Sequence, residues 1–128
     1  MTNKYKHLIR RNEVSPLGSV PFHQEISCIE RLVATDFPFH LAIHRVRDAR
    51  DLPRRYVSPH KHNVPEINVL IGNERDLRYR VQLGDEFYEV ESPASIWIPV
   101  GLEHAATVIE GSGYYLCLIL TDTKRAFE

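Results

Sequence analysis

From about residue 26 onward, short segments rich in β-branched and aromatic residues alternate with glycine, proline, asparagine and aspartate. This is the pattern of short β-strands separated by turns. It predicts strands over residues 26–34, 39–47, 56–62, 66–72, 77–83, 86–91, 94–99, 103–110 and 113–121. No long segment has the 3.6-residue period of an amphipathic helix. Many short strands at this spacing favour an all-β sandwich or barrel, a class that includes the jelly rolls.

The segment LRYRVQL, residues 77–83, shows the alternation most clearly, with Leu77, Tyr79, Val81 and Leu83 on one face. The dipeptide GD then provides a turn into EFYEVES, so the sequence predicts a β-hairpin over residues 77–91. The apolar run YYLCLIL at residues 114–120, together with Ile96, Trp97 and Ile98, is interpreted as core.

Residues 1–25 are less regular and are expected to form an arm or an edge strand. The remaining residues, 26–128, are expected to form the barrel. A chain of 128 residues fits one domain and is long enough to bury a single core.

Composition and charge argue against several classes of function. With 43% hydrophobic and 26% charged residues, the chain reads as an ordinary soluble globular protein. A formal net charge of −1 gives no field to attract nucleic acid or an anionic membrane. No apolar block follows the basic N-terminus, and the longest apolar run is far too short to span a membrane. Cys28 and Cys117 lie far apart, which disfavours a thiolate zinc site. The cytoplasm is the default compartment.

The first candidate site is the segment SPHKHNVPEINVLIG, which contains the pattern HxHxxxE. His60 and His62 would point to the same side of a strand, whereas Pro59 and Pro65 argue against a helix. On one straight strand Glu66 would lie about 13 Å beyond His62, which is too far to share an ion. A turn at residues 63–65 would bring it back to face the histidines. The pattern therefore requires a strand, a turn and a second strand.

A second segment, IWIPVGLEHAATV, contains the pattern PxGxxH. Pro99 ends a strand, Gly101 permits a tight turn, and His104 starts the next strand. This turn could aim His104 at the same interior point as the first two histidines. Three imidazoles and one carboxylate, from His60, His62, Glu66 and His104, would then surround a divalent cation.

The two patterns, about forty residues apart and in this order, resemble the two motifs of the cupin superfamily. Framework positions depart from the usual motifs: Pro93 stands where a glycine is usual, and Val108 where an asparagine is usual. The four ligand positions match. The resemblance implies a single-domain jelly-roll β-barrel with a metal ion near its centre, and commonly a homodimer.

Other residues are weighed by strand parity. His40 and His44 share one strand face and are interpreted as hydrogen-bonded polar groups or as pocket walls. Asn68 and Leu70 should face inward with Glu66, and Tyr79 and Ala106 are further candidates for the pocket wall. His7 and His23, in the irregular N-terminal part, receive no role.

The donor set limits the chemistry. Imidazole and carboxylate suit Fe²⁺, ranked first, or Mn²⁺, Ni²⁺, Co²⁺ or Zn²⁺. Four protein ligands on a six-coordinate ion leave two positions for a small chelating anion, or for a substrate with dioxygen. We expect a dioxygenase-like enzyme acting on a small carbonyl, hydroxyl or aromatic metabolite. The alternatives are a non-redox isomerase, lyase or decarboxylase, and a barrel that binds a small molecule without turnover.

Overall fold

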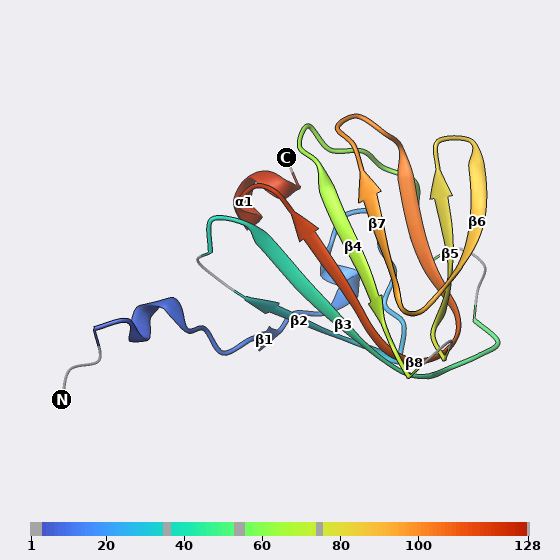
Figure 1. Cartoon of the computed structure of the whole chain (residues 1–128), viewed down its shortest axis with the longest axis horizontal. Coiled ribbons are helices and arrows are strands. Elements are labelled where there is room, and N and C mark those ends of the chain that lie inside the picture. Colours follow the sequence, from blue (N-terminus) through green and yellow to red (C-terminus); the bar gives the residue numbers. More distant parts are fainter. Residues whose placement is uncertain (1–3, 35–36, 53–55, 74–75, 128) are drawn as a thin grey trace.

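The computed structural model describes residues 4–34, 37–52, 56–73 and 76–127, which form an all-β jelly roll, as predicted (Figure 1). Within these residues the strands are β1 (Glu13–Val14), β2 (Ile29–Ala34), β3 (His40–Ala49), β4 (Glu66–Ile71), β5 (Arg78–Leu83), β6 (Glu86–Glu91), β7 (Ala94–Ile98) and β8 (His104–Ile119). Three short helices accompany them, namely η1 (Lys6–Leu8), η2 (Leu17–Ser19) and α1 (Thr123–Ala126). None of the helices in the described part of the chain is long and apolar enough to cross a membrane.

The strands pair in the order β1-β2-β3-β8-β4-β7, and every pairing is antiparallel. The predicted hairpin is confirmed as β5–β6, which joins the rest through pairing of β5 with β8. Its inward face is also as predicted, because Leu77, Tyr79 and Val81 are almost completely buried. These residues belong to one core cluster, which is shared by the two groups of strands, namely β1-β2-β3-β8-β4-β7 and the β5–β6 hairpin with the first half of β8.

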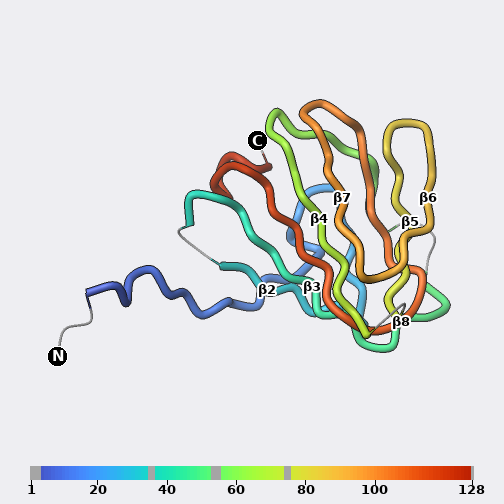
Figure 2. The backbone as a smooth tube through the Cα atoms, viewed as in Figure 1, coloured from blue at the N-terminus to red at the C-terminus, as the bar shows by residue number. Residues whose placement is uncertain are grey.

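The long strand β8 connects the two groups. Two separate strands were expected over 103–110 and 113–121, and this was wrong, because one strand spans His104–Ile119. Its first half pairs with β5 and its second half with β3 and β4. Figure 2 shows it running down one side of the molecule, bending at the bottom of the view and returning upward. The bend coincides with Gly111 and Gly113, which have φ of 103° and 152°. Glycines that suggested a turn instead allow one strand to bend.

The expected strand over 56–62 is also absent as a regular strand. This segment makes two isolated bridges, between His23 and Val57 and between His60 and His104. Pro59 cannot donate a backbone hydrogen bond, so a continuous ladder through it is unfavourable. The segment is therefore a loop that is tied to its neighbours at two points.

The N-terminal residues take two courses. Residues 4–12 extend away from the barrel (Figure 1), and β1 then forms an edge strand against β2. Farther along, Leu17 and Val20 are buried. This second part packs onto the barrel, although its sequence has no strand periodicity.

The outer face of the sheet carries apolar side chains. Trp97 was expected in the core, but it is 57% exposed, while its neighbours Ile96 and Ile98 are buried. Successive residues of a strand point to opposite faces, so the three cannot all enter the core. Pairing across the sheet aligns Trp97 with an apolar row, and a second apolar row lies beside it. The two rows, which we call the outer apolar face, are Leu41–Leu118–Ile67–Trp97 and Ile43–Leu116–Val69.

Candidate metal centre

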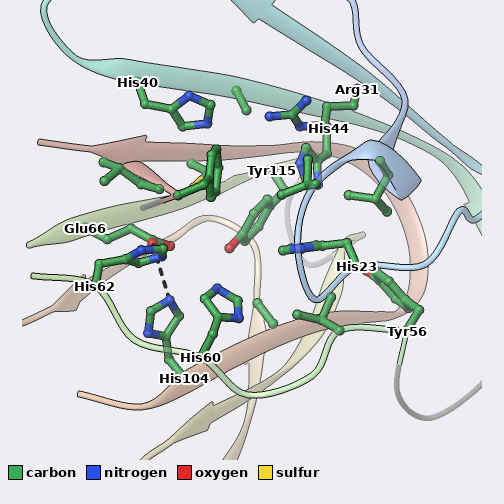
Figure 3. A pocket seen from close by; sticks show the side chains of 18 residues that line it. His23, Arg31, His40, His44, Tyr56, His60, His62, Glu66, His104 and Tyr115 are labelled. Atoms are coloured by element: carbon green, nitrogen blue, oxygen red, sulfur yellow. Dashed lines mark ion pairs between the residues drawn. The ribbon is translucent and has the colours of Figure 1, made fainter. Parts of the chain in front are cut away.

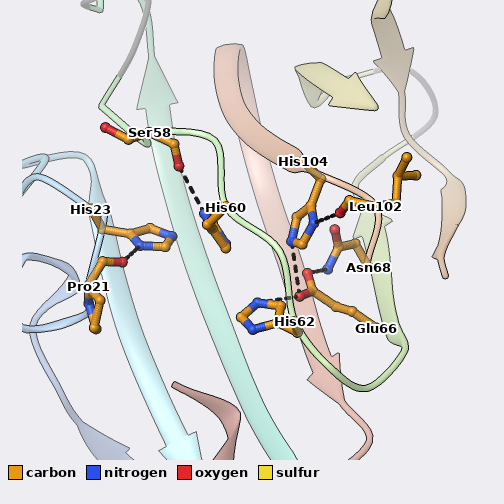
Figure 4. Close-up of polar contacts among 9 residues, drawn as sticks. All are labelled: Pro21, His23, Ser58, His60, His62, Glu66, Asn68, Leu102 and His104. Carbon is orange, nitrogen blue, oxygen red and sulfur yellow. Dashed lines mark hydrogen bonds and ion pairs between the residues drawn. The ribbon is translucent and has the colours of Figure 1, made fainter. Parts of the chain in front are cut away.

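The loop that precedes β4 and the turn that precedes β8 bring four polar side chains together. His60 and His104 exchange backbone hydrogen bonds, with N···O distances of 3.0 and 2.8 Å. The Gly101 N–H donates to the His62 carbonyl at 3.0 Å, which ties the second turn to the first loop. Glu66 begins β4 immediately after Pro65. The chain thus reverses between His62 and Glu66, although a loop precedes the turn where a strand was expected (Figure 4).

The side chains of these four residues, which we call the His–Glu cluster, converge. One ring nitrogen from each of His60, His62 and His104 lies within 4.8 Å of the others. Glu66 Oε1 lies 3.4 Å from His62 Nε2 and 3.3 Å from His104 Nε2 (Figure 3). Glu66 and His104 are each 4% exposed. The cluster therefore offers three imidazoles close to one another, with a carboxylate beside two of them.

Hydrogen bonds to the ring nitrogens and the carboxylate oxygen that point away from the centre of the cluster orient its side chains. His60 Nδ1 lies 2.9 Å from the Ser58 carbonyl, and His104 Nδ1 lies 2.9 Å from the Leu102 carbonyl. A carbonyl only accepts, so each Nδ1 carries the proton and each Nε2 keeps a free lone pair. Asn68 donates to Glu66 Oε2 at 2.7 Å. Backbone carbonyls and side chains in these positions commonly fix metal-ligating groups in other proteins.

The charges of Glu66 and of the neighbouring histidines affect one another's pKa values. Burial opposes ionisation of Glu66, but contacts with His104, His62 and Asn68 outweigh it and hold its pKa below the ordinary value. Burial likewise opposes protonation of His104, but the Glu66 carboxylate raises its pKa. Burial lowers the pKa of His60 to about 4, so this ring is neutral at neutral pH. Glu66 is therefore an anion held beside the ring nitrogens of His62 and His104.

The residues fit a divalent metal ion. His62 Nε2 and His104 Nε2 are buried, and within the described residues neither makes a well-formed hydrogen bond, although each lies within 3.4 Å of Glu66 Oε1. Buried polar atoms are normally satisfied, so orphaned lone pairs require an explanation. A cation beside a carboxylate would satisfy both, and three imidazoles with one carboxylate are suitable ligands for first-row divalent metals. A buried ion pair of Glu66 with a protonated His62 or His104 is the alternative, because both ring nitrogens lie within 3.4 Å of Glu66 Oε1.

The cluster lies in a cavity of about 530 Å³, including its opening to solvent. Of the residues expected in its wall, His40, His44 and Ala106 line it. Asn68, Leu70 and Tyr79 do not line it. Asn68 lies behind Glu66, while Leu70 and Tyr79 belong to the hydrophobic core. Strand parity identifies the inward face, but the inward face of a barrel includes both cavity wall and core.

Several lining residues were not anticipated. His23, Arg31 and Tyr115 border the cavity (Figure 3), and so does Cys117. The inward position of Arg31 could have been predicted from the sequence, because it alternates with Ile29 and Val33 on the inward face of β2. No periodicity marks His23, which reaches the cavity from the irregular N-terminal part.

His40 and His44 form a second group of imidazoles, on β3. His40 Nδ1 lies 3.0 Å from Thr123 Oγ1 of α1, and the His44 ring contacts Tyr115. Burial lowers the pKa of His40 to about 4 and that of His44 to about 3, and the charge of Arg31 adds to the effect. Both rings are therefore neutral at neutral pH and supply hydrogen-bonding groups without charge.

Comparisons with known proteins identify the fold. No family model and no curated protein sequence matches this chain. It is similar to a solved RmlC-like cupin from Shewanella frigidimarina, with a TM-score of 0.55 and 8% identity over 90% of this chain and 96% of that one. It is also similar to the polyketide cyclase RemF from Streptomyces resistomycificus, with a TM-score of 0.56 and 17% identity over 93% and 79% of the two chains.

A third similar structure is HppE with Fe(II), with a TM-score of 0.59 and 12% identity over 85% of this chain and 56% of that chain. At sequence identities this low, the similarity shows the fold alone. Together with the jelly-roll topology and the placement of HxHxxxE before β4 and PxGxxH before β8, it shows that this chain is a cupin-fold protein.

Proposed function

We propose that this protein is a metal-dependent enzyme that acts on a small metabolite in the cavity. The observation that carries the proposal is the convergence of one ring nitrogen from each of three histidines in that cavity, with the Glu66 carboxylate beside two of them. His60, His62, Glu66 and His104 would hold the ion. The bound ion would supply Lewis acidity, or a site where dioxygen and substrate meet.

The residues of the chain have separate roles in this proposal. Glu66 contributes the one negative charge of the ligand set, and Asn68 holds its second oxygen. The Ser58 and Leu102 carbonyls keep the proton on Nδ1 of His60 and His104, so that Nε2 remains a ligand. Apolar side chains such as Leu17, Val20 and Val57 exclude water from the substrate space.

We place a dioxygenase-like reaction with Fe²⁺ first, on a small carbonyl, hydroxyl or aromatic compound. Likeness to HppE, solved with Fe(II), supports the choice of metal. Likeness to RemF, a polyketide cyclase, favours the non-redox alternative, in which the metal polarises a carbonyl without redox change. Oxygen dependence distinguishes the two, because turnover that continues under strictly anaerobic conditions would rule out dioxygenation of that substrate.

Metal content tests the proposal directly. Protein purified without chelators should contain about one divalent ion per chain by elemental mass spectrometry. Chelation should lower its melting temperature, and returning Fe²⁺, Mn²⁺, Ni²⁺, Co²⁺ or Zn²⁺ should restore it. Absence of bound metal together with no stabilisation by any of these ions would refute the proposal. If metal binds but no product forms from any bound small molecule, the non-catalytic alternative is correct.

We also propose that the protein is a homodimer that pairs through the outer apolar face. Trp97, Ile71 and Tyr114 on this side of the sheet are 57%, 46% and 42% exposed. The charged pair Glu30–Arg45 lies at the edge of the apolar rows and not within them. A second copy presents the same apolar rows, so a two-fold contact would bury both faces at once.

Replacing Trp97 with glutamate should convert this dimer to a monomer, since a carboxylate would be buried without a partner. Sedimentation at micromolar concentration measures the change, from twice the chain mass to the chain mass. Phe87→Glu is the matched control, because Phe87 is also an exposed aromatic residue but lies on β6. A monomeric wild-type protein, or equal effects of the two substitutions, would contradict the proposed interface.

A further inference from the structure

Arg31 is a buried cation in the cavity wall. It lies on the inward face of β2, opposite His44 of β3, and is 6% exposed. No carboxylate of the described residues lies within ion-pair distance of its guanidinium. Burying a charge without an opposite charge is costly. A ligand that brings the missing charge would offset this cost.

The guanidinium is only partly satisfied by the protein. Nη1 donates to Ser15 Oγ at 3.0 Å and to the Ser15 carbonyl at 3.4 Å. Among the described residues these are the acceptors that Arg31 reaches, which leaves Nη2 and Nε without one. The Ser15 contacts hold one nitrogen of the planar group, and the Arg31 side chain lines the cavity.

The balance of charge in the cavity favours an anion. Glu66 is the one carboxylate among the described residues that line it. Glu66 is engaged by His62, His104 and Asn68, and it lies within the His–Glu cluster. Figure 3 shows Arg31 and His44 on one side of the cavity, with His60 and His104 on the other. The positive charge of Arg31 is therefore separate from the cluster and has no counter-charge of its own.

We propose that Arg31 binds the carboxylate of a small organic acid whose other end reaches the His–Glu cluster. The substrate class is then a carboxylic acid with a carbonyl, hydroxyl or aromatic group at its far end. The first half of this assignment concerns Arg31 alone, whereas the second half rests on the proposed metal-dependent function. A planar guanidinium matches a carboxylate with two parallel hydrogen bonds.

A monoanion fits better than a phosphate dianion. One arginine supplies a single positive charge, and burial keeps the nearby His40 and His44 neutral at neutral pH. The other lining groups near this wall are apolar or uncharged, among them Leu17, Val20 and Ala42. A second negative charge would be left without a partner at this end of the cavity.

The alternative is that Arg31 only ties the N-terminal segment to the sheet through Ser15. That role predicts a loss of folding stability when Arg31 is replaced, with no change in anion binding. An anion site predicts the reverse: removal of an uncompensated buried charge leaves the metal-free protein as stable or makes it more stable. Stability and anion binding together therefore separate the two roles.

The test is calorimetric titration of the metal-free protein with acetate and with benzoate, in a buffer without other oxyanions. Benzamide, the uncharged analogue, and inorganic phosphate are titrated in parallel. We expect a carboxylate to bind and benzamide not to bind. Arg31→Met should weaken carboxylate binding by roughly tenfold to a hundredfold, the range of a lost hydrogen bond to a charged group. Arg31→Lys, which keeps the charge but loses the planar fork, should fall between.

Arg45→Met is the matched control, because Arg45 is an arginine on the opposite face of the sheet, paired with Glu30 at 3.2 Å. It should leave carboxylate binding unchanged. Equal carboxylate affinity of wild type and Arg31→Met would overturn the proposal. Tighter binding of phosphate than of carboxylate would also overturn it. So would a failure of carboxylates to bind both the metal-free protein and the protein loaded with zinc. Arg31-dependent carboxylate binding by a protein that binds no metal would uphold the anion site and refute the metal-dependent function alone.

Discussion

Replacing His104 with alanine should weaken divalent-metal binding by more than about a hundredfold. Loss of a group that only orients a ligand typically costs about 10–100-fold in affinity, and His104 would be a ligand itself. Its Nε2 lies 3.3 Å from Glu66 Oε1 and has no other partner within the described residues. Competition with a metallochromic indicator, using Zn²⁺ and Co²⁺ as probes, gives the affinity of each variant.

His7→Ala is the control for this experiment. His7 is also an imidazole, but it is exposed and belongs to the N-terminal segment that extends away from the barrel. It should leave metal affinity unchanged. Similar losses in the two variants would show that metal binds to histidines without regard to the cavity.

Glu66→Gln distinguishes a metal site from a buried ion pair. Glutamine keeps the shape, and its carbonyl can still accept from Asn68, while its N–H₂ can donate to the lone pair of His62 or His104. If the cluster is a metal site, Glu66→Gln should lose much of the metal affinity, while the metal-free protein should lose little stability. A purely structural ion pair predicts the opposite, because breaking a buried pair costs about 3–5 kcal/mol. Denaturant unfolding of the metal-free protein measures this second quantity.

Replacing Gly111 with alanine should destabilise the metal-free protein by more than about 3 kcal/mol, or prevent folding. A Cβ at this position would lie 1.6 Å from the Asp76 carbonyl oxygen, so the backbone before β5 would have to move. The residue also has φ of 103°, which a side chain disfavours. The bend in β8 depends on this close approach, and β8 joins both groups of strands.

Gly84→Ala separates the two contributions. Gly84 also has positive φ, at 63°, but the nearest atom to an added Cβ is a leucine methyl carbon at 3.7 Å. It should lose only the backbone cost, about 1–2 kcal/mol. Urea unfolding of the two variants and the wild type gives the comparison. If Gly111→Ala is no less stable than Gly84→Ala, the close approach to Asp76 does not limit the bend.

Local pattern was sufficient for much of the fold. Alternation in LRYRVQL identified the buried face of β5, and the GD turn located the hairpin. The same alternation excludes a shared core position for Ile96, Trp97 and Ile98, because Trp97 must face outward when its two neighbours face inward. Two features needed information from distant segments. Gly111 and Gly113 bend one strand because other backbone segments pass close to them, and the loop at 56–62 is held by bridges to His23 and His104.

The sequence by itself determined the residue types and order of the His–Glu cluster, because HxHxxxE and PxGxxH are local patterns with local turn chemistry. It also determined which strand faces point inward, since the two-residue period of a strand is a property of the backbone. Only the tertiary structure decided which inward residues line the cavity and which fill the core. It placed Tyr79 in the core and brought His23 and Arg31 to the cavity wall. The physical reason is that a cavity arises where non-adjacent elements meet, and their spacing depends on pairing between segments far apart in the chain.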